Sequence, residues 1–426
     1  MLDSADTAWM LVATALVLMM TPALGFFYGG LVRSKNALNT LMMSFAALGF
    51  VGLAWALGGY SLVFAPGGSW IGGGSHLLLR GVDLGAKGSI PHLLFMAYQG
   101  TFAIVTAALI SGAIVERMSF RAYLAFITAW ALAVYAPVAH WVWGGGWLAE
   151  LGALDFAGGT VVHINAAAAA LVTAIVVGPR KDHARQAVLP QNVPFTLLGA
   201  GLLWLGWFGF NAGSALGANA SAALAFTNTM LAPMGTLVVW TLIDLRRTGK
   251  ATAVGAATAI VVGLVAITPA AGLVGPLPAI AIGVVAAVPS YAALLWRART
   301  RLDDSLDVVA AHGVGGITGA ILTGVLASRA WNGTVDGMLY GNPRQLWIQL
   351  VATVAAIAWS AGATWSILKL VALFTPLRAS RREEGLGLDV SQHGEEAYSH
   401  GEGAVLVLTE PESESPALRP AAAPVS

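Results

Sequence analysis

The sequence predicts an all-α protein that crosses a membrane many times, and three observations support this fold class. Of the 426 residues, 57% are hydrophobic and only 10% are charged, against roughly 25% charged in a typical globular domain. The mean hydropathy is +0.74. The apolar residues form stretches of about 20, the length of helix that spans a bilayer core. This composition excludes a soluble multidomain enzyme, and a net charge of +1 provides no field for binding nucleic acid.

Eleven segments are long and apolar enough to span the lipid bilayer. The strands of a membrane barrel would alternate polar and apolar residues with a period of two, whereas residues 166–177 are apolar on every face. We therefore expect eleven transmembrane helices. They cover approximately 8–30, 38–64, 91–115, 122–142, 160–178, 193–212, 221–244, 252–273, 277–296, 308–327 and 346–373.

The Lys and Arg residues predict how the chain is oriented in the membrane. Cytoplasmic loops carry an excess of both. With the N-terminus outside, the cytoplasmic side receives all but four of the 22 basic residues, the exceptions being Arg80, Lys87, Arg329 and Arg344. We expect a multi-pass protein of the cell (plasma or inner) membrane with its N-terminus outside and its C-terminus in the cytoplasm. Residues 1–8 contain no basic residue and do not resemble the start of a signal peptide, but whether one has been removed stays open.

The spans divide into an inverted 5+5 repeat and one long C-terminal helix. The halves cover about 8–178 and 193–327, and the last helix about 346–373. The fifth and tenth spans each carry one histidine near their start, His163 and His312, preceded by Asp155 and Asp307. These two spans run in opposite directions, so the matching positions indicate a functional site near the membrane midplane. The alternative is that each histidine is a neutral core residue, which placement in both halves makes less favourable.

Other classes of site find no support in the sequence. There is no cysteine, which excludes disulfides and thiolate metal sites. Neither His-Glu-x-x-His nor Gly-x-Ser-x-Gly occurs. We expect no enzymatic activity, no cofactor and no metal, and we expect His393 and His400 in the tail to be solvated.

Two domains follow from the change in composition near Pro376. Residues 1–376 form the membrane domain, and the apolar character then stops. Residues 377–426 are expected to form a cytoplasmic tail that becomes disordered towards its Pro/Ala/Glu/Ser-rich end at 410–426.

Several motifs resemble those of the ammonium transporter (Amt/Mep/Rh) family, and most closely its bacterial Amt branch. The resemblance extends in order over about residues 5–400. It rests on DFAGGTVVHINAA at 155–167, GWFGFNAGS at 206–214, DDSLD at 303–307 leading to HG at 312–313, FYGGLVR at 27–33, and WGGG at 143–146. Segment 384–389 (EGLGLD), with HGE at 393–395, resembles the regulatory C-terminus of that family, and includes Gly385 and Asp389.

The resemblance implies an outer site that recruits ammonium. Its residues are Trp143, Phe102 and Ser214, with Asp155 in an indirect role. We expect Asp307 to have the corresponding structural role within the cytoplasmic half. A small cation over an indole face gains roughly 0.5–2 kcal/mol from cation–π attraction, and the serine oxygen can accept one N–H. The alternative is that Trp143 is one of many aromatics of an interfacial belt, which its place in a WGGG turn makes less favourable.

The resemblance also implies a gated pore below that site. Phe102 and Phe210 would close its outer mouth, and His163 and His312 would line it, with Trp207 at a further lining position. Two imidazoles can share one hydrogen and each offer another ring atom to the lumen. Two phenylalanines in apolar helices are otherwise most often simple core residues.

The implied function is ammonium transport for nitrogen uptake, by a homotrimer in the lipid bilayer with one pore per subunit. Each pore would recruit ammonium, deprotonate it and conduct ammonia; whether the proton follows separately, making transport electrogenic, stays open. The tail would offer a surface to a PII-type signalling protein. Two alternatives stay open as well: an ammonium sensor that signals through the tail, and a passive Rh-like channel for ammonia or CO₂.

Overall fold

The computed structural model describes residues 1–183 and 189–398, and almost all of its regular structure is helical. Ten helical segments in the described residues are long and apolar enough to cross a membrane. The eighth expected span is instead a shorter apolar helix of 15 residues, Ala253–Ile267. The prediction of an all-α polytopic protein is confirmed. The count of eleven crossings is compatible with these segments if the shorter helix also crosses.

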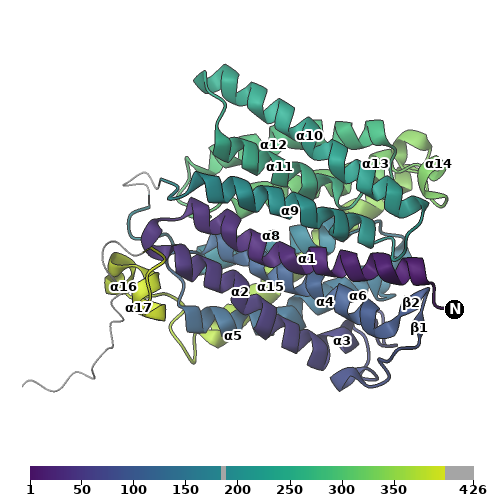
Figure 1. Ribbon diagram of the computed structural model, residues 1–426, viewed down its shortest axis with the longest axis horizontal. Coiled ribbons are helices and arrows are strands. Elements are labelled where there is room, and N and C mark those ends of the chain that lie inside the picture. Colours follow the sequence, from purple (N-terminus) through teal and green to yellow (C-terminus); the bar gives the residue numbers. More distant parts are fainter. Residues whose placement is uncertain (184–188, 399–426) are drawn as a thin grey trace, which may run out of the picture.

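The first half of the chain runs from the N-terminus to the end of α8 (Figure 1). Several of its helices are extended by a short η segment of different pitch, and one two-residue antiparallel ladder precedes α4. Its elements are α1 (Ser4–Leu31), η1 (Ser34–Asn36), α2 (Ala37–Ala54), η2 (Trp55–Gly59), α3 (Tyr60–Phe64), η3 (Leu77–Leu79), β1 (Ala86–Lys87), β2 (Ile90–Pro91), α4 (His92–Leu109), η4 (Ile110–Ala113), α5 (Phe120–Trp130), η5 (Ala131–Tyr135), α6 (Ala136–Trp143), α7 (Trp147–Leu151), η6 (Gly159–Ile164) and α8 (Asn165–Val177).

The second half of the chain is followed by a long helix and the tail. Its elements are α9 (Val193–Gly213), α10 (Ala220–Thr248), α11 (Ala253–Ile267), α12 (Pro276–Arg297), η7 (Val309–Val314) and α13 (Gly315–Leu326). The remaining elements are α14 (Arg329–Asn332), η8 (Met338–Tyr340), α15 (Pro343–Val371), α16 (Arg381–Leu386) and α17 (Leu388–His393).

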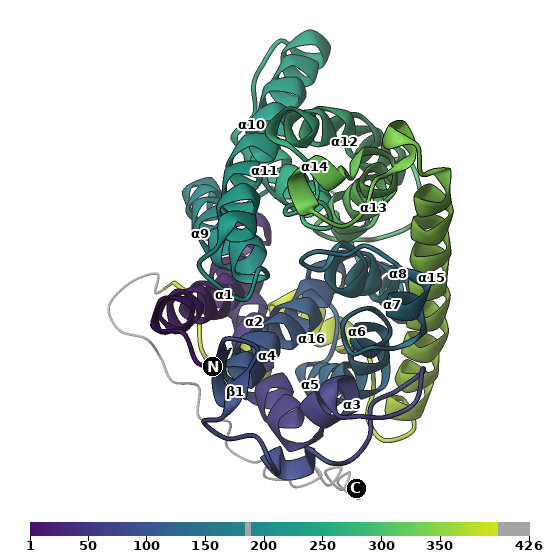
Figure 2. The same ribbon diagram turned by 90° about the vertical axis from the view of Figure 1, so that its right-hand side faces the viewer.

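The long helices run side by side along one direction, with the N-terminus at one end and α16 and α17 at the other (Figure 1). The halves meet where α1 lies against α9. Helix α15 extends along the outside and contacts α13 of the second half and α8 and α5 of the first (Figure 2). It therefore braces the two halves against each other.

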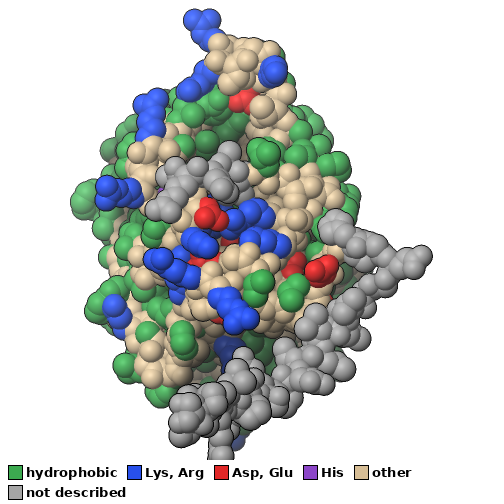
Figure 3. All heavy atoms as spheres, turned by 90° about the vertical axis from the view of Figure 1, so that its left-hand side faces the viewer, with side chains coloured by type: hydrophobic (Ala, Val, Ile, Leu, Met, Phe, Trp, Pro, Cys, Tyr) green, Lys and Arg blue, Asp and Glu red, His purple; other side chains and the backbone are tan. Residues whose placement is uncertain are grey.

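The end that carries the tail also carries clustered Lys and Arg side chains (Figure 3). Such clustering is what the positive-inside rule expects of a cytoplasmic face. The arrangement is compatible with the predicted orientation, and we call this end the inner face and the opposite end the outer face.

The contact between α1 and α9 depends on a glycine. A Cβ atom on Gly199 of α9 would meet the backbone and side chain of Phe27 on α1. A Cβ atom on Gly201, two residues further along α9, would meet nothing within 4 Å. Helices that pack in membranes use small residues to bring their backbones together. Gly199 thus sets the distance at which the two halves meet.

Replacing Gly199 by alanine is expected to destabilise the protein. The added methyl group has to push α1 away from α9, and overpacking of this kind costs about 1–3 kcal/mol. We expect the apparent unfolding temperature of the detergent-solubilised protein to fall for Gly199→Ala and to stay unchanged for the matched Gly201→Ala. Equal unfolding temperatures for the two variants would contradict the role assigned to this contact.

Candidate functional site

An aromatic site lies near the outer face, where three helices approach one another. Trp143 ends α6, Phe102 lies on α4, and Ser214 follows α9. The rings of Phe102 and Trp143 meet edge to face, with centroids 5.9 Å apart. The Ser214 hydroxyl donates to the carbonyl of Phe210 at 2.8 Å, so its oxygen lone pairs remain available to a donor. The structure therefore places Phe102 against Trp143 and links Ser214 to Phe102 through Tyr98, whose hydroxyl lies 3.4 Å from the Ser214 oxygen.

Asp155 fixes the position of this site through hydrogen bonds to Trp143 and to the start of η6. Its carbonyl accepts the indole N–H of Trp143 at 2.9 Å, and its carboxylate accepts the backbone N–H groups of residues 158, 159, 160 and 161 at 2.6–3.0 Å. Burial raises the pKa of Asp155 to about 6, although the four N–H groups favour its charged form. Because both carboxylate oxygens are occupied by the backbone, Asp155 acts on the position of Trp143 and of η6 and leaves no acid facing the substrate.

Below the aromatic site, two stacked phenylalanines close the path. The rings of Phe102 and Phe210 lie 4.2 Å apart at an angle of 24°, and both side chains are fully buried. Tyr98 is a residue that the sequence analysis missed. Its ring lies 5.0 Å from that of Phe102, and its hydroxyl reaches the carbonyls of Gly209 and Phe210 at 3.0 and 2.9 Å. Its spacing of four residues from Phe102 places both on one helix face, and this was the available signal.

Beneath the phenylalanines, the two histidines meet. The Nδ1 atoms of His163 and His312 lie 3.2 Å apart, a distance at which one nitrogen donates its hydrogen to the other. The Nε2 atom of His163 is buried and has no partner among the described residues. Trp207 stacks on His163 with ring centroids 5.3 Å apart, and its indole N–H donates to Thr268 Oγ1 at 2.9 Å. The predicted pair is thus in contact, and one ring nitrogen remains free to receive a polar solute.

The space around the histidines is narrow and apolar. It forms a cavity of about 10 Å³, close to the minimum that holds one water molecule. A hydrated ion does not fit into such a space, and its walls offer few groups to replace a hydration shell. Besides the histidines, Trp207 and Phe210, it is lined by Met20, Leu24, Phe27, Val105, Leu109, Val162, Leu203 and Val261.

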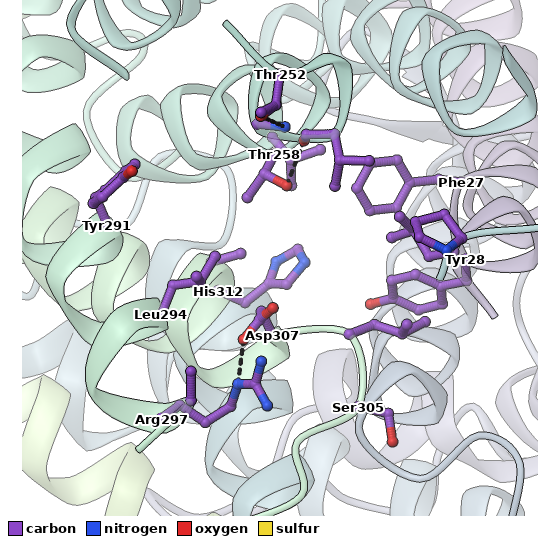
Figure 4. A pocket seen from close by; sticks show the side chains of 18 of the residues that line it. Phe27, Tyr28, Thr252, Thr258, Tyr291, Leu294, Arg297, Ser305, Asp307 and His312 are labelled. Carbon is purple, nitrogen blue, oxygen red and sulfur yellow. Dashed lines mark hydrogen bonds and ion pairs between the residues drawn. The ribbon is translucent and has the colours of Figure 1, made fainter. Parts of the chain in front are cut away.

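The path opens inward from His312 into a vestibule of about 750 Å³. Figure 4 shows His312 and Asp307 facing this cavity, with Phe27 and Tyr28 on the opposite wall. Asp307 has a left-handed backbone conformation, with φ of 58°, and its carboxylate pairs with the guanidinium of Arg297. Asp307 is therefore a charged group of the inner vestibule that is neutralised by its neighbour.

The counterpart of Asp155 in the second half is Asp304, and the expectation that Asp307 fills this role was wrong. The Asp304 carboxylate accepts the backbone N–H groups of Val308 and Val309 at 3.1 and 2.7 Å. Like Asp155, it lies eight residues before the pore histidine of its half, and both acids cap the start of a η segment, η7 and η6. Helix starts within a membrane need such acceptors, because their first N–H groups have no partner in the helix.

A buried ionic network supports the vestibule from the inner face. The Glu116 carboxylate accepts from Arg33 Nε at 3.0 Å, Asn36 Nδ2 at 3.0 Å and Arg180 NH1 at 2.7 Å, and Arg180 also binds Asp303 at 2.8 Å. Although burial opposes ionisation, the arginines keep the pKa of Glu116 below its usual value and lower that of Asp303 to about 2. The sequence analysis did not identify this network, because its members come from four different loops.

The tail segment 377–398 docks on the inner face next to this network. Asp389 accepts the backbone N–H groups of Leu38 and Asn39 at 3.0 and 2.7 Å, so it caps α2 from outside that helix. Lys35 in turn donates to the carbonyl of Gly385 at 2.6 Å. Both predicted tail residues thus lie at the contact between the tail and the membrane domain. The expected disorder at 410–426 lies outside the described residues.

The prediction that His393 is solvated was wrong, whereas His400 lies outside the described residues. The Nε2 atom of His393 is 2.9 Å from Asn39 Nδ2, and its ring packs edge to face on Phe120, with centroids 4.7 Å apart. His393 is therefore a docking residue of the tail. No cluster of three or more His, Asp or Glu side chains suited to a metal occurs in residues 1–183 and 189–398.

A narrow, histidine-lined cavity that leads into an inner vestibule is typical of channels and transporters among helical membrane proteins. Comparison with known proteins narrows this class. The Ammonium Transporter Family model matches residues 8–398, and the chain belongs to that family. It is 47% identical over 398 residues to the ammonium transporter of Bacillus subtilis (strain 168), an alignment that covers 92% of this chain and 98% of that protein.

Solved structures agree with this assignment. The crystal structure of Candida albicans Mep2 matches with a TM-score of 0.85 at 36% identity, covering 90% of this chain and 88% of that one. A structure described as a Sensor Amt Protein matches with a TM-score of 0.85 at 29% identity, covering 91% and 98%. The predicted family, its bacterial branch and the prediction of a multi-pass transport protein that is not an enzyme are confirmed.

Thr268 is expected to control the pore through Trp207. Thr268→Val keeps the shape of the side chain but leaves the buried indole N–H without an acceptor, a loss of about 1–3 kcal/mol, whereas Thr268→Ser keeps the acceptor. We expect the valine variant to transport ammonium more slowly than the serine variant, measured as uptake into proteoliposomes. Equal rates for the two variants would show that this hydrogen bond does not matter to the pore.

Proposed function

We propose that the chain captures ammonium at the outer aromatic site, removes a proton from it, and conducts ammonia past the two histidines to the cytoplasm. The observation that carries this proposal is the contact of His163 with His312 in a narrow apolar cavity directly below the stacked phenylalanines. Family membership supports the substrate. The individual steps rest on the geometry.

Capture uses the indole face of Trp143, the ring of Phe102 and the hydroxyl oxygen of Ser214. A cation over an aromatic face is attracted by about 0.5–2 kcal/mol, and the Ser214 oxygen accepts one of its N–H groups. The Asp155 carboxylate is not available at this point, because four backbone N–H groups bind it. The cation is therefore held weakly enough to react and move on.

Deprotonation is favoured on the way into the pore, with the proton passing to water on the outer side of Phe102 and Phe210. An ion that leaves the outer site has to shed its hydration to pass Phe102 and Phe210, and burying an unpaired charge costs far more than burying a neutral molecule. Ammonia passes without that cost, and the free Nε2 of His163 can receive one of its N–H groups. Potassium has no proton to give up, so the same barrier excludes it.

Assembly and regulation complete the proposal. We propose a homotrimer with one pore per subunit, a membrane domain of residues 1–376, and a cytoplasmic tail of residues 377–426 that binds a PII-type signalling protein. The tail contacts at Asp389 and Gly385 support the last point, because they connect α16 and α17 to the loop before α2. We place the protein in the plasma or inner membrane with its N-terminus outside.

The second candidate function is an ammonium sensor that signals through the tail. It is favoured by the similarity to a structure described as a sensor and by the docked tail. The pore favours transport, because a sensor needs an ammonium site and no route to the inner vestibule.

The transport proposal is tested by electrical current on a solid-supported membrane. Proteoliposomes receive an ammonium pulse and, separately, a potassium pulse. The wild type is expected to respond only to ammonium. His163→Ala removes the partner of His312 and the free Nε2, and is expected to lose at least about tenfold in ammonium current, the equivalent of one buried hydrogen bond, or to admit potassium.

The matched control is His76→Ala, a histidine of the outer loop whose side chain bonds to the carbonyl of Arg80 and packs against Tyr60 and His92, away from the pore histidines. It should retain the wild-type response. A His163→Ala variant with unchanged ammonium current and unchanged exclusion of potassium would refute the role of the histidines. Without any wild-type current, a light-scattering assay for ammonia separates gas conduction from sensing.

The docking of the tail is tested by Asp389→Ala. The change removes a charged cap from α2, worth about 1–2 kcal/mol, and is expected to release the tail, to alter the transport rate and to weaken binding of a PII-type protein. Glu395→Ala, an exposed acid of the same tail, is the control. Limited proteolysis of the tail, uptake and binding to immobilised protein are compared, and identical results for both variants and the wild type would refute the proposed docking.

A further inference from the structure

The structure contains a third buried histidine, which neither the pore nor the tail uses. His140 lies on α6, three residues before Trp143, and is 2% exposed. Its Nδ1 atom is 2.6 Å from the carbonyl oxygen of Val63, and its Nε2 atom is 2.7 Å from the carbonyl oxygen of Gly68. Both ring nitrogens therefore face hydrogen-bond acceptors.

Only one protonation state suits this arrangement. A neutral imidazole carries one N–H and one lone pair, so one carbonyl oxygen would face the lone pair at a distance where the two repel. The doubly protonated ring donates to both. Both distances are at the short end of the range for N–H···O bonds, as is typical of charged donors. The carbonyl of Val63 also belongs to the last turn of α3, the negative end of the helix dipole, which favours a cation.

We propose that His140 is held as an imidazolium that fastens the outer loop 65–73 to α6 and thereby positions Trp143 in the outer aromatic site. In this role it is a positioning residue for ammonium capture, and the inference rests on the function proposed for that site. The cation is balanced by carbonyl dipoles, because neither ring nitrogen has a carboxylate partner among the described residues.

The two hydrogen bonds of the His140 ring are called the clamp below. The surrounding backbone explains how this clamp affects the position of Trp143. The carbonyl of His140 accepts the N–H groups of Gly144 and Gly146 at 2.9 and 3.0 Å, and these build the turn that follows Trp143. On the other side of that turn, the N–H of Trp147 donates to the carbonyl of Ser69 at 3.0 Å. The turn is thus held between the helix and the outer loop, and His140 bonds to both.

The clamp also explains why glycine is required at the contact. A Cβ atom on Gly144 would collide with the carbonyl oxygen of Val63 and with Nδ1 of His140, and a Cβ on Gly72 would meet the backbone of Ser61 and Leu62. Larger residues would push the loop out of reach of the imidazole. The Gly-rich composition of this loop, for which the sequence alone provides no function, follows from this close approach.

The other titratable side chains near α6 lie on or next to the elements that contact it: Tyr60 on α3, Tyr135 on η5, Glu150 on α7, His163 on η6, and Asp155, whose carbonyl accepts the indole N–H of Trp143. None of them is hydrogen-bonded to the His140 ring in the part of the chain that the structure describes. A neutral ring would therefore keep only one of the two clamp bonds.

The protonation state is tested directly by ¹⁵N NMR of histidine-labelled wild-type protein in lipid bilayers, with His140→Gln used to assign the resonances. We expect both nitrogens of His140 to carry a proton at neutral pH. One protonated and one bare nitrogen would overturn the proposal. This measurement uses the intact protein and does not depend on transport.

The positioning role is tested by the ammonium concentration dependence of transport. His140→Ala is expected to raise KM about tenfold, the effect of one lost charge-assisted hydrogen bond, with the maximal rate within about twofold of wild type. The glutamine of His140→Gln can donate to one carbonyl, so the KM of this variant is expected to lie between those of the wild type and His140→Ala. His76→Ala is the control and should leave KM unchanged.

The outcomes separate this inference from the function on which it rests. An unchanged KM in a folded His140→Ala variant would overturn the positioning role. If the wild type itself moves no ammonium, the proposed function fails, whereas the NMR result still decides whether His140 is an imidazolium. If His140→Ala does not fold, the glutamine variant and the NMR measurement carry the test.

Discussion

The contact between the two pore histidines constrains most of the surrounding structure. His163 and His312 come from different halves, so their Nδ1 atoms lie 3.2 Å apart only if η6 and η7 approach closely. Gly316 permits this, because even a Cβ atom there would be tight against Ile164 and His163. The close approach also buries the starts of both η segments in apolar surroundings, where their free N–H groups need acceptors. Asp155 and Asp304 supply these acceptors, one in each half.

The same arrangement supports the proposed mechanism, in which a cation is attracted at the outer site and then excluded from the pore. The acids nearest to the path are occupied: Asp155 by backbone N–H groups, and Asp307 by Arg297. A free carboxylate beside the lumen would bind ammonium strongly and slow its release. Aromatic faces and a hydroxyl attract the cation by a small free energy instead, and the apolar constriction below them favours the neutral form. In the proposed mechanism, weak capture of the cation at the outer site and its exclusion by the apolar constriction below therefore depend on each other.

The sequence predicts the membrane architecture well because lipid leaves few alternatives to long apolar helices. The first expected span, 8–30, matches α1 at Ser4–Leu31, and the histidine pair follows from its placement in both halves. The eighth span was predicted too long, because α11 ends at Ile267, just before Thr268 and Pro269. Asp304 was overlooked although it lies eight residues before His312, the same spacing as Asp155 before His163; what decides the role is which carboxylate reaches the N–H groups of the next turn.

Contacts between distant segments have no comparable signature in a single sequence. The docking of His393 on α2 and α5, and the convergence of four loops on Glu116, depend on how the helices are arranged in space.

The inner and outer faces of the protein stabilise their buried charges in different ways. The inner face pairs arginines with buried acids around Glu116, whereas at the outer face His140 is bonded to carbonyl groups alone. An acid placed there to balance the imidazolium would also offer ammonium a strong site next to Trp143. Carbonyl dipoles stabilise the proposed imidazolium without creating such a competitor, so the outer clamp can be charged although no carboxylate among the described residues bonds to the His140 ring.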